Sequence, residues 1–239
     1  MQLDTYFQPV ATSATDAFSF TRQHASNFAK RVADDFNPIH DIDAKRFCVP
    51  GDLLFAIALS KLGLSQKMHI SFSDMVSDGV ELHLQQEDDE HTAIQDANGK
   101  TYLRISARGE HCSDQDKIRG LTEQYVAFSG TTFPHVLVPL WQQHDVMVNP
   151  ARPLVIYESM SIELDDFDFD RPTLQLAQPS LEVNGKRGNV RLPFVFKQGD
   201  REIGHGEKRM VISGLKPFDK AAIDDLVEFY NRRKVELGC

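Results

Sequence analysis

The segment at residues 34–40, with the sequence DDFNPIH, constrains this chain more than any other stretch. Pro38 fixes its own φ and disfavours the helical region for Asn37, so the backbone must bend sharply there. The bend carries carboxylate, amide and imidazole groups on a rigid support, which suits acid–base chemistry. Asn-Pro and Asp are also common in ordinary turns, so a purely structural turn is the alternative interpretation.

Composition indicates a globular protein and excludes several classes of partner. Among 239 residues, 41% are hydrophobic and 26% are charged, which is enough apolar material for a sizeable core. The formal net charge of -9 disfavours nucleic acids and anionic membranes as partners. The first seven residues lack the features of a signal peptide, and the apolar stretch 53–64 is too short to span a bilayer. A cytoplasmic location is therefore predicted.

The sequence predicts neither a metal site nor a cofactor. Cys48, Cys112 and Cys239 lie far apart and form no CxxC pair, so buried or idle thiols are expected. The histidines share no spacing typical of metal ligands.

The periodicity of the first half changes from helical to extended. Residues 22–33 have apolar positions at helical spacing and lead into the bend. A second helix opens at Gly51 and Asp52, is apolar on every side over residues 53–59 and ends at Gly63, so it should be buried. Alternating strands are predicted at 69–73, 80–84 and 102–107, with a turn in the acidic run 87–90 and a hairpin turn at 98–99.

The second half repeats this order of elements. We predict a helix at 120–128, a turn at 129–135, an apolar helix at 136–141, strands at 154–164, 173–183, 188–197 and 202–213, and a closing helix at 218–237. One enclosed helix and a strongly bent antiparallel sheet in each half make an α+β architecture. Each helix needs apolar contact all round, so the two halves should cover one another.

The motif also resembles a known family. The residues at 28–29, 35–40, 44, 50–51 and 53 resemble the signature of MaoC-like, (R)-specific enoyl-CoA hydratases, in which a GDxNPxHxD segment precedes the central helix of a hotdog fold. The resemblance implies a double hotdog, with an N-terminal repeat at 1–117, a degenerate C-terminal repeat at 118–215 and a C-terminal helix at 216–239. An uncharacterised bacterial double-hotdog family is the same resemblance at a coarser level.

The resemblance implies hydration or dehydration at C2=C3 of an acyl thioester, carried by coenzyme A or acyl-carrier protein, as in fatty acid metabolism. Asp35 and His40 would be the catalytic acid–base pair, and Asn37 would orient one of them. Backbone N–H groups at Gly51 and Asp52 would meet the thioester oxygen as it gains charge. Gly51 is equally well explained as permitting a tight entry into the helix. Further pairing of double-hotdog units into a homodimer is also compatible with the resemblance.

Three departures from the family pattern keep two rival functions open. Asp34 replaces a glycine, the usual His-Gly at the start of the central helix is Pro50-Gly51 followed by Asp52, and the acidic residue expected after His40 falls at Asp41 or Asp43. The negative charges of Asp34 and Asp52 would repel an anionic enolate, so a non-enzymatic acyl-thioester-binding protein is one rival. A thioesterase, with Asp35 acting toward the carbonyl carbon, is the other. His135 has no aspartate five residues before it, so a structural or pocket-lining role is expected there.

Overall fold

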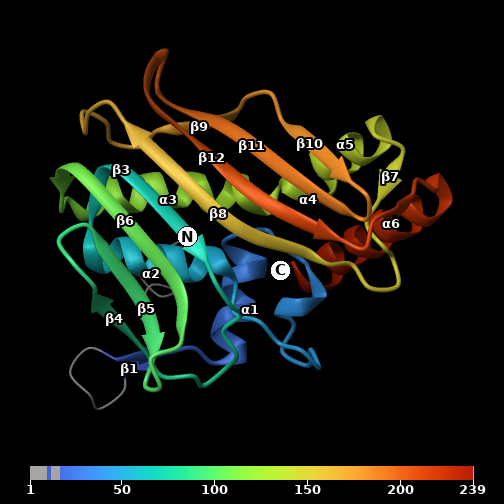
Figure 1. Cartoon of the computed structure of the whole chain (residues 1–239), viewed down its shortest axis with the longest axis horizontal. Helices are drawn as coiled ribbons and strands as arrows, with labels where there is room; N and C mark the ends of the chain where they lie inside the picture. The colour runs from blue at the N-terminus through green and yellow to red at the C-terminus, as the bar shows by residue number, and fades with distance from the viewer. Residues whose placement is uncertain (1–9, 12–16, 239) are drawn as a thin grey trace.

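A computed structural model of the chain describes residues 10–11 and 17–238 (Figure 1). The amino-terminal residues considered for a signal peptide and Cys239 lie outside the described residues. Within the described ranges, none of the helices combines the length and apolar character needed to cross a bilayer.

The strands form one large antiparallel sheet whose order is β1-β2-β4-β5-β6-β3-β8-β12-β11-β10, with β9 also paired to β11. β7 and β13 make a separate small pair. The strands are β1 (Val10–Ala11), β2 (Phe18–Ser19), β3 (Leu64–Phe72), β4 (Leu82–Gln86), β5 (His91–Asp96), β6 (Thr101–Cys112), β7 (Val146–Met147), β8 (Val155–Leu164), β9 (Thr173–Leu176), β10 (Ser180–Asn184), β11 (Arg187–Gln198), β12 (Arg201–Ser213) and β13 (Lys216–Pro217).

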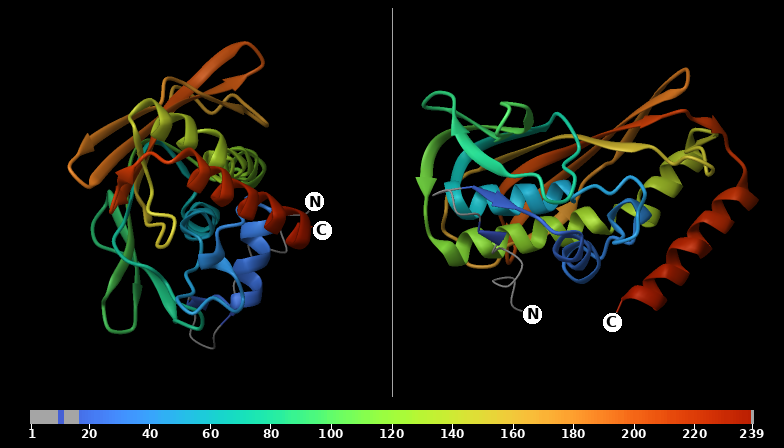
Figure 2. Two further views of the ribbon diagram at one scale, coloured as in Figure 1. Left: turned by 90° about the vertical axis from the view of Figure 1, so that its right-hand side faces the viewer. Right: turned by 90° about the horizontal axis from the view of Figure 1, so that it is seen from below.

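The helices lie against the concave side of this sheet, which curves around them (Figure 2). They are α1 (Arg22–Arg31), the 3₁₀ turn η2 (Pro38–His40), α2 (Gly51–Leu62), α3 (Gln115–Gly130), α4 (Thr132–His135), α5 (Leu137–Gln143) and α6 (Lys220–Leu237).

The apolar helix α2 is enclosed, as its composition predicts. Every residue from Asp52 to Leu59 is buried, and Gly63 ends the helix with a φ of 82°, a value that glycine adopts without strain. Phe55 is fully buried and meets the ring of Tyr125 on α3 at 5.0 Å between centroids. Burying one such ring contributes about 2–3 kcal/mol, so contacts across the two helices account for much of the core.

The predicted α+β double hotdog is confirmed. In the first half, the order β2-β4-β5-β6-β3 surrounds α2. At the centre, β3 pairs with β8 from Lys67↔Glu163 to Ser71↔Ser159, so the two halves share one continuous sheet. The main apolar cluster draws residues from both halves, including Phe55 and Phe194.

Several boundaries differ from the predictions. The helix predicted at 120–128 runs from 115 to 130, and most of the predicted turn at 129–135 is helical. The helix beside α2 is α3, whereas the predicted apolar helix is α5, which contributes its buried Leu137, Leu140 and Trp141 to a second apolar cluster. β5 was missed because its buried residues, Ala93 and Ile94, are adjacent and do not alternate. The predicted strand 173–183 is two strands, β9 and β10.

The boundary predicted between residues 117 and 118 falls within α3. The division into an N-terminal repeat, a C-terminal repeat and a closing helix stays a prediction.

Candidate functional site

The bend predicted at Asn37-Pro38 is present and is locally encoded. Asn37 caps η2, because its side-chain oxygen accepts a hydrogen bond from Ile39 N–H at 3.2 Å. Its own N–H donates to Asp35 Oδ1 at 2.9 Å. Asn37 therefore touches Asp35 through its backbone, while its side chain closes the turn.

The structure brings Asp35 and His40 together. His40 Nε2 lies 3.6 Å from Asp35 Oδ2, and His40 Nδ1 lies 2.7 Å from the carbonyl oxygen of Cys48. A carbonyl oxygen only accepts, so Nδ1 carries a hydrogen, and in the neutral ring Nε2 presents its lone pair to Asp35. The 3.6 Å between these two atoms is longer than a hydrogen bond, and one water molecule could donate to both of them.

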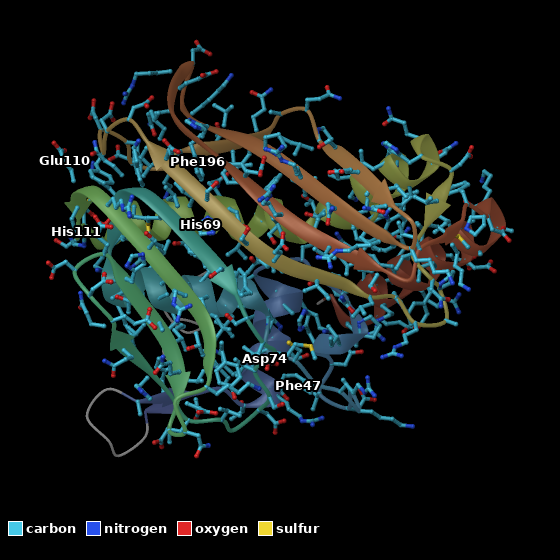
Figure 3. The ribbon with its side chains drawn as sticks, in the orientation of Figure 1. Phe47, His69, Asp74, Glu110, His111 and Phe196 are labelled. Atoms are coloured by element: carbon cyan, nitrogen blue, oxygen red, sulfur yellow. The ribbon has the colours of Figure 1, made fainter. Side chains whose placement is uncertain are left out.

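The carbonyl that orients His40 is itself firmly held. Cys48 N–H donates to Ile39 O at 3.0 Å, and Val49 N–H donates to Val76 O at 2.8 Å. Figure 3 labels Phe47 in this segment and Asp74 in the loop beside it. Burial raises the pKa of the Cys48 thiol to about 11, so this cysteine is a poor nucleophile near neutral pH.

The amino end of α2 faces the strands closely. A Cβ on Gly51 would lie 3.0 Å from the Phe72 ring and 3.2 Å from the Tyr157 ring, so these rings would have to shift by a few tenths of an ångström to admit a larger residue. Pro50 O accepts from Leu53 and Leu54 N–H. Within the part of the chain that the structure describes, the N–H groups of Gly51 and Asp52 have no acceptor, as expected for the first turn of a helix. These groups carry the partial positive charge of the helix terminus.

Asp52 belongs to a buried polar network that connects the two halves. Its Oδ2 accepts a short hydrogen bond from the Ser129 hydroxyl, and Ser129 Oγ in turn accepts from Lys208 Nζ. Lys208 Nζ also lies 4.3 Å from the ring centroid of Tyr157, and the Tyr157 hydroxyl shares a short hydrogen bond with that of Tyr125. Asp52 Oδ1 is buried without a hydrogen-bond partner.

The charges of this network act on one another and on the motif. Burial raises the pKa of Asp52, opposed mainly by the nearby Lys208 ammonium. Burial lowers the pKa of Lys208, and the carboxylates of Asp52 and Asp35 oppose that shift. Burial penalises both charged forms, and their mutual attraction opposes that penalty. The positive charge of Lys208 therefore offsets the carboxylate at the start of α2.

Ser129 and Lys208 were not among the predicted site residues. A usable signal was present for Lys208, because strand alternation places it on the same face of β12 as the buried Gly206 and Met210. Ser129 had no such signal, since it stands in a segment that was predicted to be a turn.

His135 lies apart from the predicted pair. It lines an open groove of about 530 Å³ together with residues of α5 and α6, among them Val138, Ile223 and Val227. Neither Asp35 nor His40 lines this groove. His69 and His111, labelled in Figure 3, lie on β3 and at the end of β6, on strands rather than in the motif turn.

Several solved structures are similar to this chain over most of its length. A tesB protein from Mycobacterium avium subsp. paratuberculosis is similar with a TM-score of 0.51 and 9% identity, covering 88% of this chain and 98% of that one. A protein of unknown function with a hot dog fold from Alicyclobacillus acidocaldarius is similar at 0.48 and 9%, covering 90% and 99%. A MaoC-like dehydratase is similar at 0.44 and 9%, covering 83% and 96%.

Identities this low carry the fold and not the reaction. No curated protein matches the chain. One family model does match, over residues 1–221, so the chain belongs to the family described as "Protein of unknown function (DUF3581)".

Proposed function

We propose that this protein hydrates or dehydrates the C2=C3 bond of an acyl thioester carried by coenzyme A or acyl-carrier protein. The observation that carries the proposal is the pairing of Asp35 with His40, whose imidazole is held by the Cys48 carbonyl. The pair offers two acceptors to one water, so it is suited to orienting and deprotonating that water. The amino end of α2, with its N–H groups at Gly51 and Asp52, supports the charge that develops on the thioester oxygen.

The departures from the family motif fit this proposal because their charges are matched. Asp34 forms an ion pair with Lys234, and Asp52 is linked to Lys208 through Ser129. Each of these two carboxylates therefore lies near a lysine ammonium of the same chain, and this positive charge reduces the repulsion of an anionic enolate.

Crotonyl-CoA is the direct test. We expect loss of the enoyl absorbance without release of free thiol. Asp35→Asn and His40→Gln should each lower kcat by about 100- to 10,000-fold, the range for removal of a general acid or base. Asp200→Asn and His205→Gln are matched controls, since both residues are exposed and outside the motif; their rates should match the wild-type rate.

Thioester hydrolysis is the second candidate, and one observation favours it. Asp52 Oδ1 is buried and unpartnered at the start of α2, next to the Ser129 hydroxyl, so that carboxylate is available to hold a water. Release of free thiol from saturated acyl-CoAs would select this candidate. Loss of that release in Asp35→Asn would assign the predicted Asp35, whereas loss in Asp52→Asn with retention in Asp35→Asn would assign Asp52 instead. Binding of acyl-CoA with no turnover of either substrate class would reject both reactions.

A further inference from the structure

Helix α6 reaches back to the motif turn from the far end of the chain, and Figure 2 shows it beside the amino-terminal helices. The hydroxyl of Tyr230 accepts a hydrogen bond from Phe36 N–H at 3.1 Å and donates to the carbonyl oxygen of Asp34 at 3.3 Å. These two groups stand on either side of Asp35. The Tyr230 ring is buried, with Phe36 at 6.1 Å and Phe133 at 5.0 Å between centroids.

The turn needs support because of the conformation of Asp34. Its φ is 55°, in the left-handed region that glycine adopts freely and other residues adopt at a cost of about 1 kcal/mol or more. Asp34 stands where the resembled motif has glycine. Lys234 of α6 forms an ion pair with the Asp34 carboxylate, and Tyr230 of α6 donates to the Asp34 carbonyl oxygen. Helix α6 therefore contacts both the side chain and the backbone of Asp34.

A second set of charges holds the other end of the turn. Arg233 donates to Phe36 O at 3.2 Å and forms an ion pair with Asp41, the residue after His40. Lys30 of α1 also lies 2.9 Å from the Asp41 carboxylate. The side chains of all three charged residues are largely buried, so these contacts are screened less than surface ion pairs.

We propose that α6 is the positioning element of the Asp35–His40 pair, and that Tyr230 is a positioning residue which fixes Asp35 through the peptide groups on both sides of it. The effect of this positioning on catalysis rests on the proposed function, whereas the fixing of Asp35 by Tyr230 does not. Tyr230 and Lys234 lie beyond residue 221, where the family match ends.

The test is Tyr230→Phe in the full chain, which removes the hydroxyl and keeps the ring packing. Three quantities are measured: exchange of the Phe36 amide hydrogen, the imidazole ¹⁵N resonances of His40, and kcat and KM with crotonyl-CoA. We expect Phe36 exchange to rise at least about 10-fold, the His40 resonances to shift, and kcat to fall about 10- to 100-fold with KM little changed. Tyr102→Phe is the control for loss of a tyrosine hydroxyl elsewhere in the chain: it removes one hydrogen bond, to Asp96 at 3.1 Å on β5, whereas Tyr230→Phe removes two.

Each result separates the two proposals. Unchanged Phe36 exchange or unchanged His40 resonances in Tyr230→Phe would overturn the positioning role, whether or not the protein turns over substrate. Altered resonances with an unchanged kcat would overturn it as well, while leaving the hydratase proposal standing. A wild-type chain without turnover would overturn the hydratase proposal, and the exchange and resonance measurements would then decide the positioning role alone.

The conformation of Asp34 provides an independent test. Glycine adopts this φ without strain, so Asp34→Gly should make the turn less dependent on α6. We expect Tyr230→Phe to lower kcat in both backgrounds. The fold-decrease in the Asp34→Gly background should be less than about a third of the fold-decrease in the wild type. Losses that simply multiply would contradict the claim that α6 supports the strained turn.

Discussion

At the scale of single residues, the buried Asp52–Ser129–Lys208 network should be costly to disturb. Removing one ion of a buried pair leaves the other uncompensated and destabilises proteins by about 3–5 kcal/mol. We expect this loss for Lys208→Met, measured as the free energy of unfolding in urea. The double variant Asp52→Asn/Lys208→Met should regain most of it, and a double variant as unstable as Lys208→Met would contradict the coupling between Asp52 and Lys208.

Cys48 predicts a pH dependence of stability. The folded protein holds the thiol proton up to a pKa of about 11, whereas the ordinary value is 9.0. A raised folded pKa means that this contribution is complete below 9.0 and is lost as the pH rises through about 11. Between about pH 8 and about pH 10.5, wild type should lose about 2 kcal/mol relative to Cys48→Ala, as measured by urea unfolding. A difference independent of pH would count against burial of this thiol.

At the scale of elements, the carboxyl end of α3 approaches the segment that follows α1 closely, and this approach depends on one glycine. A Cβ on Gly130 would lie 1.4 Å from the carbonyl oxygen of Ala33, which the backbone cannot accommodate without moving. Gly130→Ala should therefore cost about 3 kcal/mol or more, seen as a lower Tm by calorimetry. Ala127→Gly, at an exposed position of the same helix, should cost only about 1 kcal/mol. Equal effects of the two changes would show that the approach is not tight.

The candidate site is also assembled from elements of both halves. Asp35, His40 and Asp52 come from the first half, whereas Ser129 and Lys208 come from the second. Ser129 and Lys208 link a buried ammonium to the Asp52 carboxylate and so balance its charge. This arrangement explains how Asp52 is accommodated at the start of a buried helix.

At the scale of the whole molecule, the continuous sheet through β3 and β8 predicts cooperative unfolding. The main core includes residues from both halves, and the second cluster contains Trp141, the one tryptophan of the chain. Fluorescence of Trp141 therefore reports on the second cluster, and circular dichroism reports on the whole fold. We expect the two urea transitions to coincide. A fluorescence transition at lower urea would show that the second cluster unfolds separately.

The sequence by itself determined the local features of this protein. The bend at Asn37-Pro38, the enclosed helix after Gly51 and the alternating strands follow from φ restriction and hydrophobic period, which depend on neighbours in the chain. The tertiary structure decided what lies around the bend. Tyr230 and Lys208 reach the motif region across more than a hundred residues because the sheet closes around α2 and α6 folds back. Local periodicity carries no information about such contacts, so the partners of Asp34 and Asp52 emerged only once the halves were packed together.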